Sequence, residues 1–428
     1  MIEKLVSRYV RHMNQRLMNF EASPDGVAIP PPGAEKKYLL YLHIPFCVVL
    51  CPFCPFHRVE FREHRARDYF DALGREIDAA GDAGYRFGEL YIGGGTPTVL
   101  PDRLIETIGR VSAVHVLSGI SVETNPHDLD EGNMSRLVEA GVTRLSVGVQ
   151  SFDDGLLRQM QRYEKYGSGA QIRKHLIRVM GAFPTLNVDM IFNFPQQTTA
   201  MLDRDLHMLT EEIVVDQVSW YPLMTAGATR RSMHRELGVV DYDREKSLYE
   251  RIARHMLDAG YERASAWCFS RRPGMFDEYI VEHEEYLGLG SGAFSYLAGA
   301  LYANTFSINH YLRLVDSSGS SCVRERRLTP LEQMRYYLLM KLFGGALELD
   351  VAEARFSERF ASTLWRDLTG LRLIGATRES AGRITLTESG NYLWVVLMRE
   401  FFTGVNNFRD DMRHHISKET ELMSAGFG

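Results

Sequence analysis

Residues 43–57 read His43-Ile-Pro-Phe-Cys-Val-Val-Leu-Cys-Pro-Phe-Cys-Pro-Phe-His57. They hold three of the five cysteines of the chain, Cys47, Cys51 and Cys54, at C-x3-C-x2-C spacing. The preceding residues 37–44 are apolar and typical of a strand, so we expect the cysteines in a loop at the carboxyl end of that strand. Thiolates are preferred ligands of iron–sulfur clusters. Three of them would leave one iron of a [4Fe–4S] cluster open for a substrate or cofactor.

Two other interpretations of these cysteines stay open at this point. A structural zinc site normally has four ligands, so a zinc loop would need a distant fourth ligand such as Cys268 or His57. The cysteines could also be buried without a metal, although unligated cysteines rarely cluster at ligand spacing. The other two cysteines of the chain, Cys268 and Cys322, are isolated, and we expect both to be buried as small hydrophobic side chains.

Length, charge and composition exclude several classes of protein. A chain of 428 residues with 45% hydrophobic residues can bury a large core. The net charge of −6 argues against a nucleic-acid partner, which would need clustered basic residues. Few cysteines, a charged N-terminus without an apolar signal segment and a longest apolar run of only residues 392–398 predict a cytoplasmic protein without stable membrane insertion.

Short apolar strands alternate with helical patterns from about residue 38 onward. This alternation predicts an α/β fold with a parallel sheet, of which six strand–helix units form a partial (β/α)6 TIM-like barrel. In such barrels the chemistry lies on the loops after the strands. The expected strands are 38–44, 89–92, 120–123, 144–149, 186–192, 217–221 and 263–267. The expected helices are 66–83, 101–112, 130–140, 153–160, 169–181, 199–213 and 242–259.

The two ends of the chain show different patterns, which predict three domains. Residues 1–35 combine an amphipathic helix over 2–20 with a Pro-rich linker, and residues 36–300 form the barrel. Residues 301–428 form a mainly helical, winged-helix-like domain that we expect to cover the substrate rather than to bind DNA. Its expected elements are helices at 330–342, 350–356 and 357–368, hairpin strands at 373–377 and 383–387, and a last helix at 388–402.

Two Gly-rich turns follow expected strands. Gly93-Gly-Gly-Thr-Pro-Thr98 comes directly after the second strand, where consecutive glycines let a ligand approach the backbone and its N–H groups. It has neither the spacing of a dinucleotide site nor that of a P-loop. Gly288-Leu-Gly-Ser-Gly-Ala-Phe-Ser295 follows the last strand and would admit a second ligand. An ordinary turn is the alternative interpretation of each.

Four polar side chains lie in or beside the apolar strands. Glu123, Gln150 and Asp189 each lie within the end of a strand segment that is otherwise apolar, and polar groups inside a barrel need partners. A polar ligand inside the barrel would satisfy all three, and the alternative is an internal hydrogen-bond network. Arg162 lies just beyond the fourth strand, where its cation could meet a ligand carboxylate or simply face solvent.

These motifs together resemble one family. Residues 41–47 followed by the three cysteines, Gly93-Gly-Gly-Thr-Pro97, Ser146-Val-Gly-Val-Gln-Ser-Phe152, Asp189 with Pro195, and Gly288-Leu-Gly-Ser-Gly292 occur in the order found in radical S-adenosylmethionine (SAM) enzymes of the HemN-like branch, typified by oxygen-independent coproporphyrinogen III oxidase. The likeness covers about residues 36–310 and continues more weakly through the C-terminal domain.

The resemblance implies the cofactors and their contacts. It implies a [4Fe–4S] cluster on Cys47, Cys51 and Cys54, with SAM on the fourth iron, and an electron donor of the reduced flavodoxin or ferredoxin type. A tyrosine near the cluster matches Tyr41, a candidate catalytic residue. The matching SAM contacts are Gly94, Gly95, Thr96, Glu123, Gln150, Arg162 and Asp189. Gly292 and Ala293 match a region that can hold a second SAM in this branch.

The sequence departs from the oxidase where the substrate is concerned. The oxidase has a further cysteine where this chain has Phe56, and its N-terminal substrate-covering segment is not recognisable in residues 1–35. Heme chaperones of the branch also lack that cysteine. We therefore expect a HemN-like methyltransferase acting on an unsaturated or aromatic ring such as a quinone, heteroaromatic or tetrapyrrole. Two Gly-rich turns and an apolar C-terminal segment with Trp394, Phe401, Phe402, Val405 and Phe408 motivate this. Tetrapyrrole decarboxylation or conversion and heme chaperoning are the alternatives.

Overall fold

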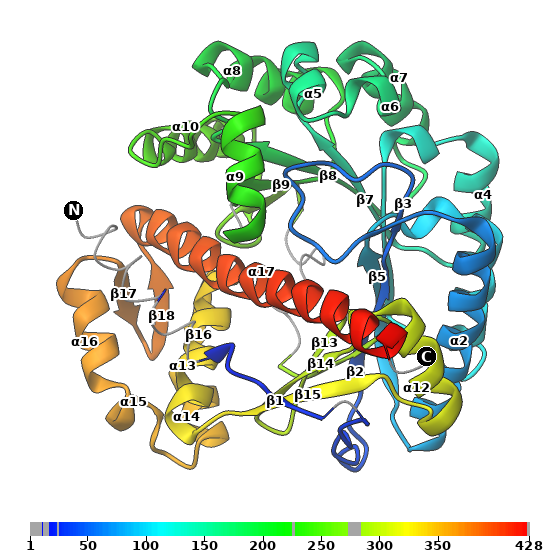
Figure 1. Cartoon of the computed structure of the whole chain (residues 1–428). Helices are drawn as coiled ribbons and strands as arrows, with labels where there is room; N and C mark the ends of the chain where they lie inside the picture. Colours follow the sequence, from blue (N-terminus) through cyan, green and yellow to red (C-terminus); the bar gives the residue numbers. More distant parts are fainter. Residues whose placement is uncertain (1–10, 12–16, 24, 225–226, 273–283, 426–428) are drawn as a thin grey trace.

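A parallel sheet forms the core of the computed structural model, which describes residues 11, 17–23, 25–224, 227–272 and 284–425 (Figure 1). Each strand continues the ladder of its neighbour in the same direction. In spatial order the parallel strands are β12 (Tyr286–Leu289), β2 (Tyr38–Ile44), β5 (Phe87–Gly94), β6 (Gly119–Thr124), β7 (Arg144–Gln150), β8 (Thr185–Phe192) and β9 (Gln217–Pro222). The six strands predicted between residues 38 and 221 are confirmed.

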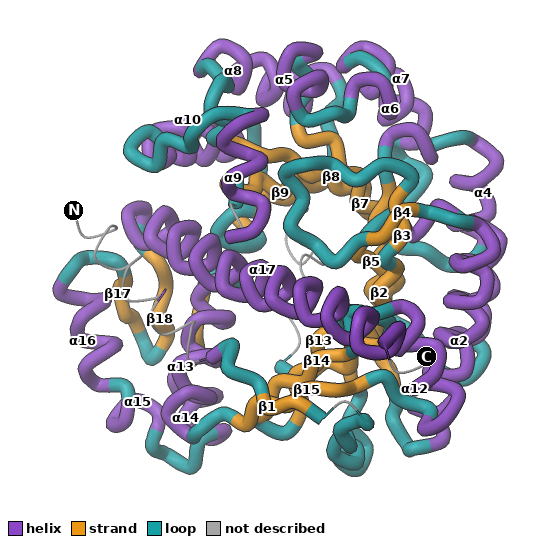
Figure 2. Tube along the Cα trace, viewed as in Figure 1, coloured by secondary structure: helices purple, strands orange, loops and turns teal. Residues whose placement is uncertain are grey.

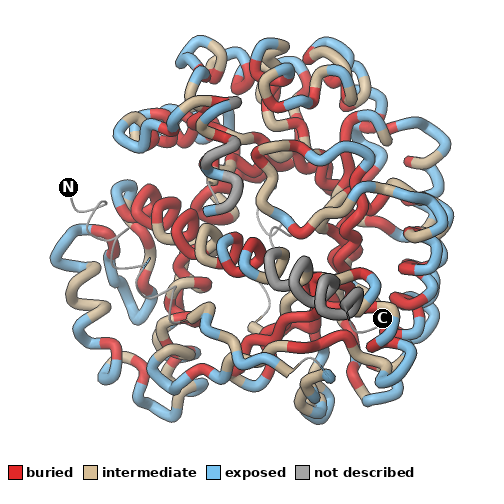
Figure 3. The backbone as a smooth tube through the Cα atoms, in the orientation of Figure 1, coloured by how far each residue is buried: buried red, intermediate tan, exposed pale blue. Residues whose placement is uncertain are grey.

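Helices cover the outer face of this sheet, and their exposed sides face solvent while the strands are buried (Figure 3). The sequence marks where several of them begin, since Asp130, Asp153, Ser168 and Thr198 cap helix N-termini with their side chains. The helices are α2 (Glu63–Asp82), α3 (Pro101–Ser112), α4 (Glu131–Glu139), α5 (Asp154–Gln159), α6 (Tyr163–Tyr166), α7 (Gly169–Val179), α8 (Thr199–His207) and α10 (Glu245–Asp258). α9 (Gly227–Glu236), which the sequence pattern did not predict, precedes α10.

The sheet does not close into a ring, because antiparallel strands extend both of its edges. At one edge β9 pairs with β11 (Cys268–Ser270), which pairs with β10 (Glu262–Arg263). The predicted parallel strand at 263–267 is therefore wrong: a tight turn, in which the Ala264 N–H donates to the Cys268 carbonyl, occupies most of that range. The fold is thus a partial barrel, as predicted.

A meander extends the other edge of the sheet beyond β12. It consists of β13 (Phe294–Leu297), β14 (Ala300–Asn304), β15 (Cys322–Arg327) and β1 (Glu21–Ala22), with α12 (Ile308–Ser318) between β14 and β15. The predicted boundary between the barrel and the C-terminal domain, at residue 300, falls on the first residue of β14. The predicted N-terminal segment, residues 1–35, supplies β1. Most of the predicted helix at 2–20 lies outside the described residues.

The C-terminal region is mainly helical and contains a small sheet of order β16-β18-β17 (Figure 2). One predicted helix, at 357–368, is split in the structure, and the first hairpin strand starts later than predicted because α16 occupies Leu373. The elements are α13 (Pro330–Phe343), β16 (Ala346–Glu348), α14 (Leu349–Arg355), α15 (Phe360–Thr363), α16 (Trp365–Leu373), β17 (Thr377–Ser380), β18 (Arg383–Leu386) and α17 (Glu388–Ala425).

The long helix α17 crosses the open face of the barrel (Figure 1). It was predicted to end at Phe402 but continues to Ala425. A buried ion pair joins its first half to α10: Arg399 donates to Glu245, which is fully buried and also accepts from the Tyr392 hydroxyl at 3.2 Å. Arg399 also donates to Glu400 at 3.0 Å. Charges buried in this way hold α17 in one register on the barrel.

We predict that Arg399→Met strongly destabilises the fold. The change leaves the Glu245 carboxylate buried without its cation, which costs roughly 3–5 kcal/mol. Urea unfolding followed by tryptophan fluorescence measures the free energy of unfolding. The double variant Glu245→Gln with Arg399→Met should lose less of this free energy than Arg399→Met alone, because no carboxylate is then left without its cation. Asp203→Asn is the control, because it breaks an exposed pair with Arg251 and should cost at most about 1 kcal/mol. The prediction would be contradicted if Arg399→Met and Asp203→Asn lowered the free energy of unfolding by the same amount.

Asp205 gives a pH-dependent contribution to stability. This carboxylate on α8 accepts from the Ser151 hydroxyl and the Phe152 N–H, both at 2.8 Å, and burial raises its pKa to about 7. The folded chain therefore binds more protons than the unfolded chain between about pH 4 and pH 7, so this contribution to stability falls as pH rises through that range. In Asp205→Asn the free energy of unfolding should fall less between about pH 5 and pH 8 than in the unchanged protein. If urea titrations showed the same fall in the free energy of unfolding for Asp205→Asn and for the unchanged protein, this role of Asp205 would be excluded.

Candidate functional site

A cavity of about 250 Å³ opens at the carboxyl ends of the parallel strands, underneath α17. Its walls come from the cysteine loop, from the ends of β2, β5, β6, β7, β8 and β9, and from α17. Two of the residues predicted for the site, Gly292 and Ala293, do not line the cavity. The predicted residues that do line it are Tyr41, Cys47, Cys51, Cys54, Gly94, Gly95, Thr96, Glu123, Gln150, Arg162 and Asp189.

The three clustered cysteines are free thiols on one wall of this cavity. Cys47 ends the short strand β3 (Phe46–Cys47), which pairs with β4 (Val59–Glu60). Cys47 and Cys51 are buried, whereas Cys54 is half-buried. Below the loop, Phe53 packs edge-on against Phe194 with ring centres 5.9 Å apart. This packing holds the loop to the ends of the strands and to α5.

Hydrogen-bond donors point at two of the sulfur atoms. The Thr96 hydroxyl lies 3.6 Å from the Cys47 Sγ, and the Arg162 Nη1 lies 3.8 Å from the Cys51 Sγ. Donors and positive charge at these distances favour thiolate over thiol. Burial raises the pKa of the Cys47 thiol, with the nearby Cys54 adding to the rise. Metal coordination overcomes such a rise, because a coordinating thiol is deprotonated outright.

The cysteines fit a cluster better than a zinc ion. Among the described residues, no three or more His, Cys, Asp or Glu side chains lie close enough together to hold one metal ion. Neither proposed fourth zinc ligand lines the cavity. Cys268 is buried on β11, and His57 is buried with its Nε2 3.2 Å from the Ser291 Oγ. Three thiols on a cavity wall, with no fourth cysteine and no histidine among the described residues that line it, suit a [4Fe–4S] cluster with one open iron.

The first Gly-rich turn brings β5 very close to the end of β2. A Cβ atom at Gly94, whose φ is +112°, would lie 2.6 Å from the His43 ring, and one at Gly95 would lie 2.7 Å from the Phe46 carbonyl oxygen. The N–H groups of the turn already have partners: Gly94 donates to Glu123 at 3.0 Å, Gly95 to Ile44 and Thr96 to Phe46. These three N–H groups therefore bond within the protein, and the glycines allow the close backbone approach. Binding of a ligand by this turn stays a prediction.

Tyr41 belongs to a short chain of hydrogen bonds. Its hydroxyl lies 2.9 Å from the His43 Nδ1, and the His43 Nε2 lies 3.0 Å from the His57 carbonyl oxygen. Burial lowers the pKa of His43 to about 4, so its ring is neutral at physiological pH. A carbonyl can only accept, so Nε2 carries the proton and the Tyr41 hydroxyl donates to Nδ1. Toward the cavity, the Tyr41 oxygen can therefore act only as a hydrogen-bond acceptor.

Two carboxylates, Glu123 and Asp189, occupy the polar part of the cavity. Glu123 accepts from the Tyr91 hydroxyl at 2.9 Å and from the Gly94 N–H, while Asp189 accepts from the side chains of Ser146 at 2.9 Å and Asn187 at 2.8 Å. Burial and the charge of Asp189 raise the pKa of Glu123. Glu123 and Asp189 therefore belong to an internal hydrogen-bond network, as the alternative interpretation expected, and they also face the cavity. Binding of a polar ligand by them stays a prediction.

Gln150 and Arg162 shape the wall between the carboxylates and the cysteines. Gln150 has φ of +76°, and the ladder between β7 and β8 shifts register between Gly148 and Gln150. Such a bulge re-aims a side chain, and Gln150 lines the cavity. Arg162 is buried, donates to the Gly148 carbonyl and to the Asn125 Oδ1, and packs on the Tyr166 ring. The alternative of a solvated Arg162 is wrong.

The far part of the cavity is aromatic and apolar, and sequence reasoning largely missed it. Trp267 lies beside Tyr221, with ring centres 5.3 Å apart, and beside Phe402 of α17, at 5.8 Å. Of the C-terminal apolar residues predicted to cover the substrate, only Phe402 lines the cavity. The others pack inside the protein. The residues of the far part that the sequence pattern did not single out are Tyr221, Leu223, Met224, Trp267, Asn406 and Arg409.

The second Gly-rich turn lies behind the cysteine loop. A Cβ at Gly292, whose φ is +80°, would lie 2.5 Å from the His57 ring, and Ala293 is buried. The fully buried Glu76 of α2 fixes the turn by accepting from the Gly290 N–H at 2.8 Å and from the Ser321 N–H at 3.0 Å. Close packing therefore accounts for these glycines, and binding of a second SAM stays a prediction.

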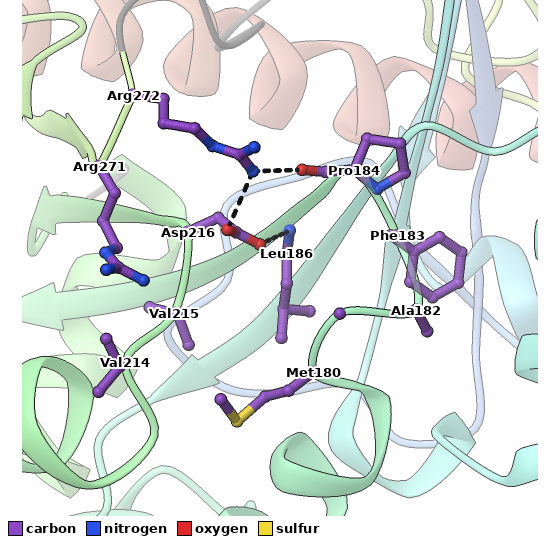
Figure 4. A pocket seen from close by; sticks show the side chains of 11 residues that line it. Met180, Ala182, Phe183, Pro184, Leu186, Val214, Val215, Asp216, Arg271 and Arg272 are labelled. Atoms are coloured by element: carbon purple, nitrogen blue, oxygen red, sulfur yellow. Dashed lines mark hydrogen bonds and ion pairs between the residues drawn. The ribbon is translucent and has the colours of Figure 1, made fainter.

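A larger cavity, of about 570 Å³, lies at the opposite ends of β8 and β9 (Figure 4). None of the predicted site residues lines it. Asp216 lines this cavity, and its carboxylate accepts from the Leu186 N–H at 3.0 Å and from Arg272 at 3.3 Å. Arg272 also donates to the Pro184 carbonyl. Size alone therefore does not mark the functional site, because this cavity carries none of the cysteine chemistry.

In the described residues no helix is long and apolar enough to cross a membrane. Cys268 and Cys322 are buried, as predicted.

Comparisons with known proteins agree with this geometry. Residues 41–209 match the family model of the radical SAM superfamily. The heme chaperone HemW of Lactococcus lactis is 28% identical over 390 residues, covering 87% of this chain and 100% of HemW. The oxygen-independent coproporphyrinogen III oxidase of Escherichia coli K12 is 27% identical over 360 residues, covering 78% of each chain. The solved structure of the Escherichia coli oxidase HemN superposes with a TM-score of 0.73 at 22% identity, covering 91% of this chain and 92% of HemN. The chain therefore contains a radical SAM domain and has HemN-like homologues, and the cofactors that this domain implies are a [4Fe–4S] cluster and SAM.

Proposed function

We propose that this chain is a radical SAM enzyme that acts on a flat ring substrate of the tetrapyrrole class. The observation that carries the proposal is one cavity with two different halves. One half has three free thiols and two half-buried carboxylates, and the other has Trp267, Tyr221 and Phe402. The first half suits the cofactors and the second suits the face of a ring.

Cys47, Cys51 and Cys54 would hold the cluster, which when bound supplies an electron that cleaves SAM to methionine and a 5′-deoxyadenosyl radical. The Thr96 hydroxyl and the Arg162 guanidinium would stabilise negative charge on the sulfur atoms. Glu123 and Asp189 would accept hydrogen bonds from SAM, and Arg162 and Gln150 would complete its binding site. Tyr41 would orient the bound groups through its oxygen lone pairs, since its proton is directed to His43.

The cysteine loop would also be the route for electrons. Its tip is exposed, with 58% of Val48 and 43% of Leu50 accessible to solvent. A one-electron donor of the reduced flavodoxin or ferredoxin type could therefore approach within a few residues of the three thiols.

The names of the relatives support the substrate class. HemW is named for heme, and the oxidase for coproporphyrinogen; both are tetrapyrroles. Methyl transfer to the ring stays the prediction of the sequence, with two SAM molecules as its premise. The position of Gly292 and Ala293 outside the cavity lining adds no support to that premise.

One product experiment decides between the reactions. Reconstituted protein is given SAM, reductant and either heme or coproporphyrinogen III without oxygen, and the products are followed by mass spectrometry. We expect 5′-deoxyadenosine or S-adenosylhomocysteine to form in proportion to modified tetrapyrrole. A gain of one carbon with S-adenosylhomocysteine identifies methyl transfer, and loss of carbon dioxide identifies decarboxylation. Stoichiometric heme binding without substrate-linked SAM consumption would overturn the proposal in favour of a chaperone.

We further predict that Cys51→Ala abolishes the electron paramagnetic resonance signal of the reduced [4Fe–4S] cluster. Two thiols cannot replace the three that line the cavity, so cluster iron and SAM cleavage should be lost together. Cys268→Ala is the matched control, because Cys268 is equally buried but stands on β11 outside the cavity. A full signal in Cys51→Ala would refute the ligand assignment.

A further inference from the structure

A line of hydrogen bonds connects two of the three thiols through side chains of the cavity wall. The Arg162 Nη2 donates to the Asn125 Oδ1 at 3.3 Å, and the Asn125 Nδ2 donates to the Thr96 Oγ1 at 2.9 Å. The ends of the line are the two donors already described, Arg162 at the Cys51 Sγ and Thr96 at the Cys47 Sγ. Asn125, which directly follows β6, thus joins both donors.

The chemistry of the end groups fixes the direction of each bond in this line. A guanidinium only donates, so Arg162 requires the amide oxygen of Asn125 to face it, and the amide nitrogen then faces Thr96. The Thr96 oxygen accepts from that nitrogen. Its own hydrogen atom is therefore left to point at the Cys47 Sγ, 3.6 Å away. An amide turned the other way would draw this hydrogen atom toward its oxygen and away from the sulfur.

The side chains of the line are held in place by burial and packing. Thr96, Asn125 and Arg162 are 4%, 8% and 4% exposed, so water competes little for their bonds. Arg162 also donates to the Gly148 carbonyl, and its guanidinium carbon lies 4.2 Å from the centre of the Tyr166 ring. Donors fixed in this way stay directed at the sulfur atoms and do not reorganise when the charge there changes.

Donors that point at ligand sulfur atoms favour the more negative redox state of a cluster. When a [4Fe–4S] cluster takes up one electron from a reductant, its net charge becomes more negative by one, and hydrogen bonds to sulfur are among the factors that set its reduction potential. Groups that orient such donors contribute in the same way from behind them. In a buried site these bonds are electrostatically stronger than in water. Both donors that Asn125 joins should therefore raise the potential.

We propose that Asn125 is a positioning residue that raises the reduction potential of the cluster, because it directs the Thr96 hydroxyl to Cys47 and holds Arg162 at Cys51. This inference rests on the cluster of the proposed function and is independent of the ring substrate. It assigns part of the ease of electron uptake to a side chain that is not a cluster ligand. A purely structural role of Asn125 would leave the potential unchanged.

The test is an anaerobic redox titration of the reconstituted protein without SAM, in which electron paramagnetic resonance measures the reduced cluster. Asn125→Leu removes both bonds at similar volume. We expect the equilibrium constant for reduction to fall about tenfold, a shift of about 59 mV to more negative potential for one electron. Asn125→Ala, which removes the same bonds without the bulk of leucine, should shift the potential in the same direction.

Variants of Thr96 show whether Asn125 acts through its neighbour. Thr96→Val should lower the potential, whereas Thr96→Ser, which keeps the hydroxyl, should retain it. The shift in the double variant Asn125→Leu with Thr96→Val should be smaller than the sum of the two single shifts, because both changes remove the same donor from Cys47.

Asn391→Leu is the matched control. Asn391 of α17 is also 8% exposed and donates to the Thr387 carbonyl at 3.0 Å, but it does not line the cavity. It should leave the potential unchanged, and the iron content of every variant is measured before the titration.

An unshifted potential in the two Asn125 variants with full iron content, or in Thr96→Val, would overturn the role of Asn125 and leave the cluster ligands standing. Loss of the cluster from both Asn125 variants would also overturn it, because a structural role would then account for the residue. If the unchanged protein itself held no cluster after reconstitution, the proposed function would fall together with this inference.

Discussion

The close approach of β5 to the end of β2 is the constraint on which the rest of the site depends. Only glycine fits at Gly94 and Gly95, because any side chain would meet the His43 ring or the Phe46 carbonyl. That approach presses His43 toward Tyr41 and lets Glu123 accept from the backbone of the Gly-rich turn. It also fixes Thr96 beside Cys47. One backbone contact thus helps to position Cys47, Tyr41 and Glu123 together.

The sequence predicted the parts of the fold that have strong periodicity. The parallel strands β2, β5, β6, β7, β8 and β9 and the helix α3 match their predicted ranges, since buried parallel strands are nearly continuous apolar runs. The short strands β3 and β4 were not predicted. The cavity lining was predicted where a polar side chain interrupted an apolar strand, because the ends of parallel strands meet at one edge. Glu123, Gln150 and Asp189 were found for that reason, although they are far apart in the chain. Tyr221, an aromatic residue near the end of β9, was missed for the same reason.

Residues whose position depends on tertiary contacts were beyond prediction. The range 263–267 looked like a further parallel strand, yet its apolar residues serve a turn that places Trp267 in the cavity. The end of α17 is a different case, because Val405, Phe408, Met412 and Ile416 continue the apolar residues at helical spacing beyond Phe402, so the extension of this helix was open to prediction. Arg409, by contrast, was beyond prediction. Nothing in the neighbouring sequence marks it as different from the other arginines of that helix.

The helix over the cavity mouth also sets an order of events during synthesis. All strands of the barrel, and the loop with its three thiols, leave the ribosome well before α17, and domains generally fold as units while the chain grows. The barrel can therefore be complete while its mouth is still uncovered. Until α17 docks, the cavity that the three thiols line has no cover on the side of that helix. The last helix to be made is thus the one that closes the site.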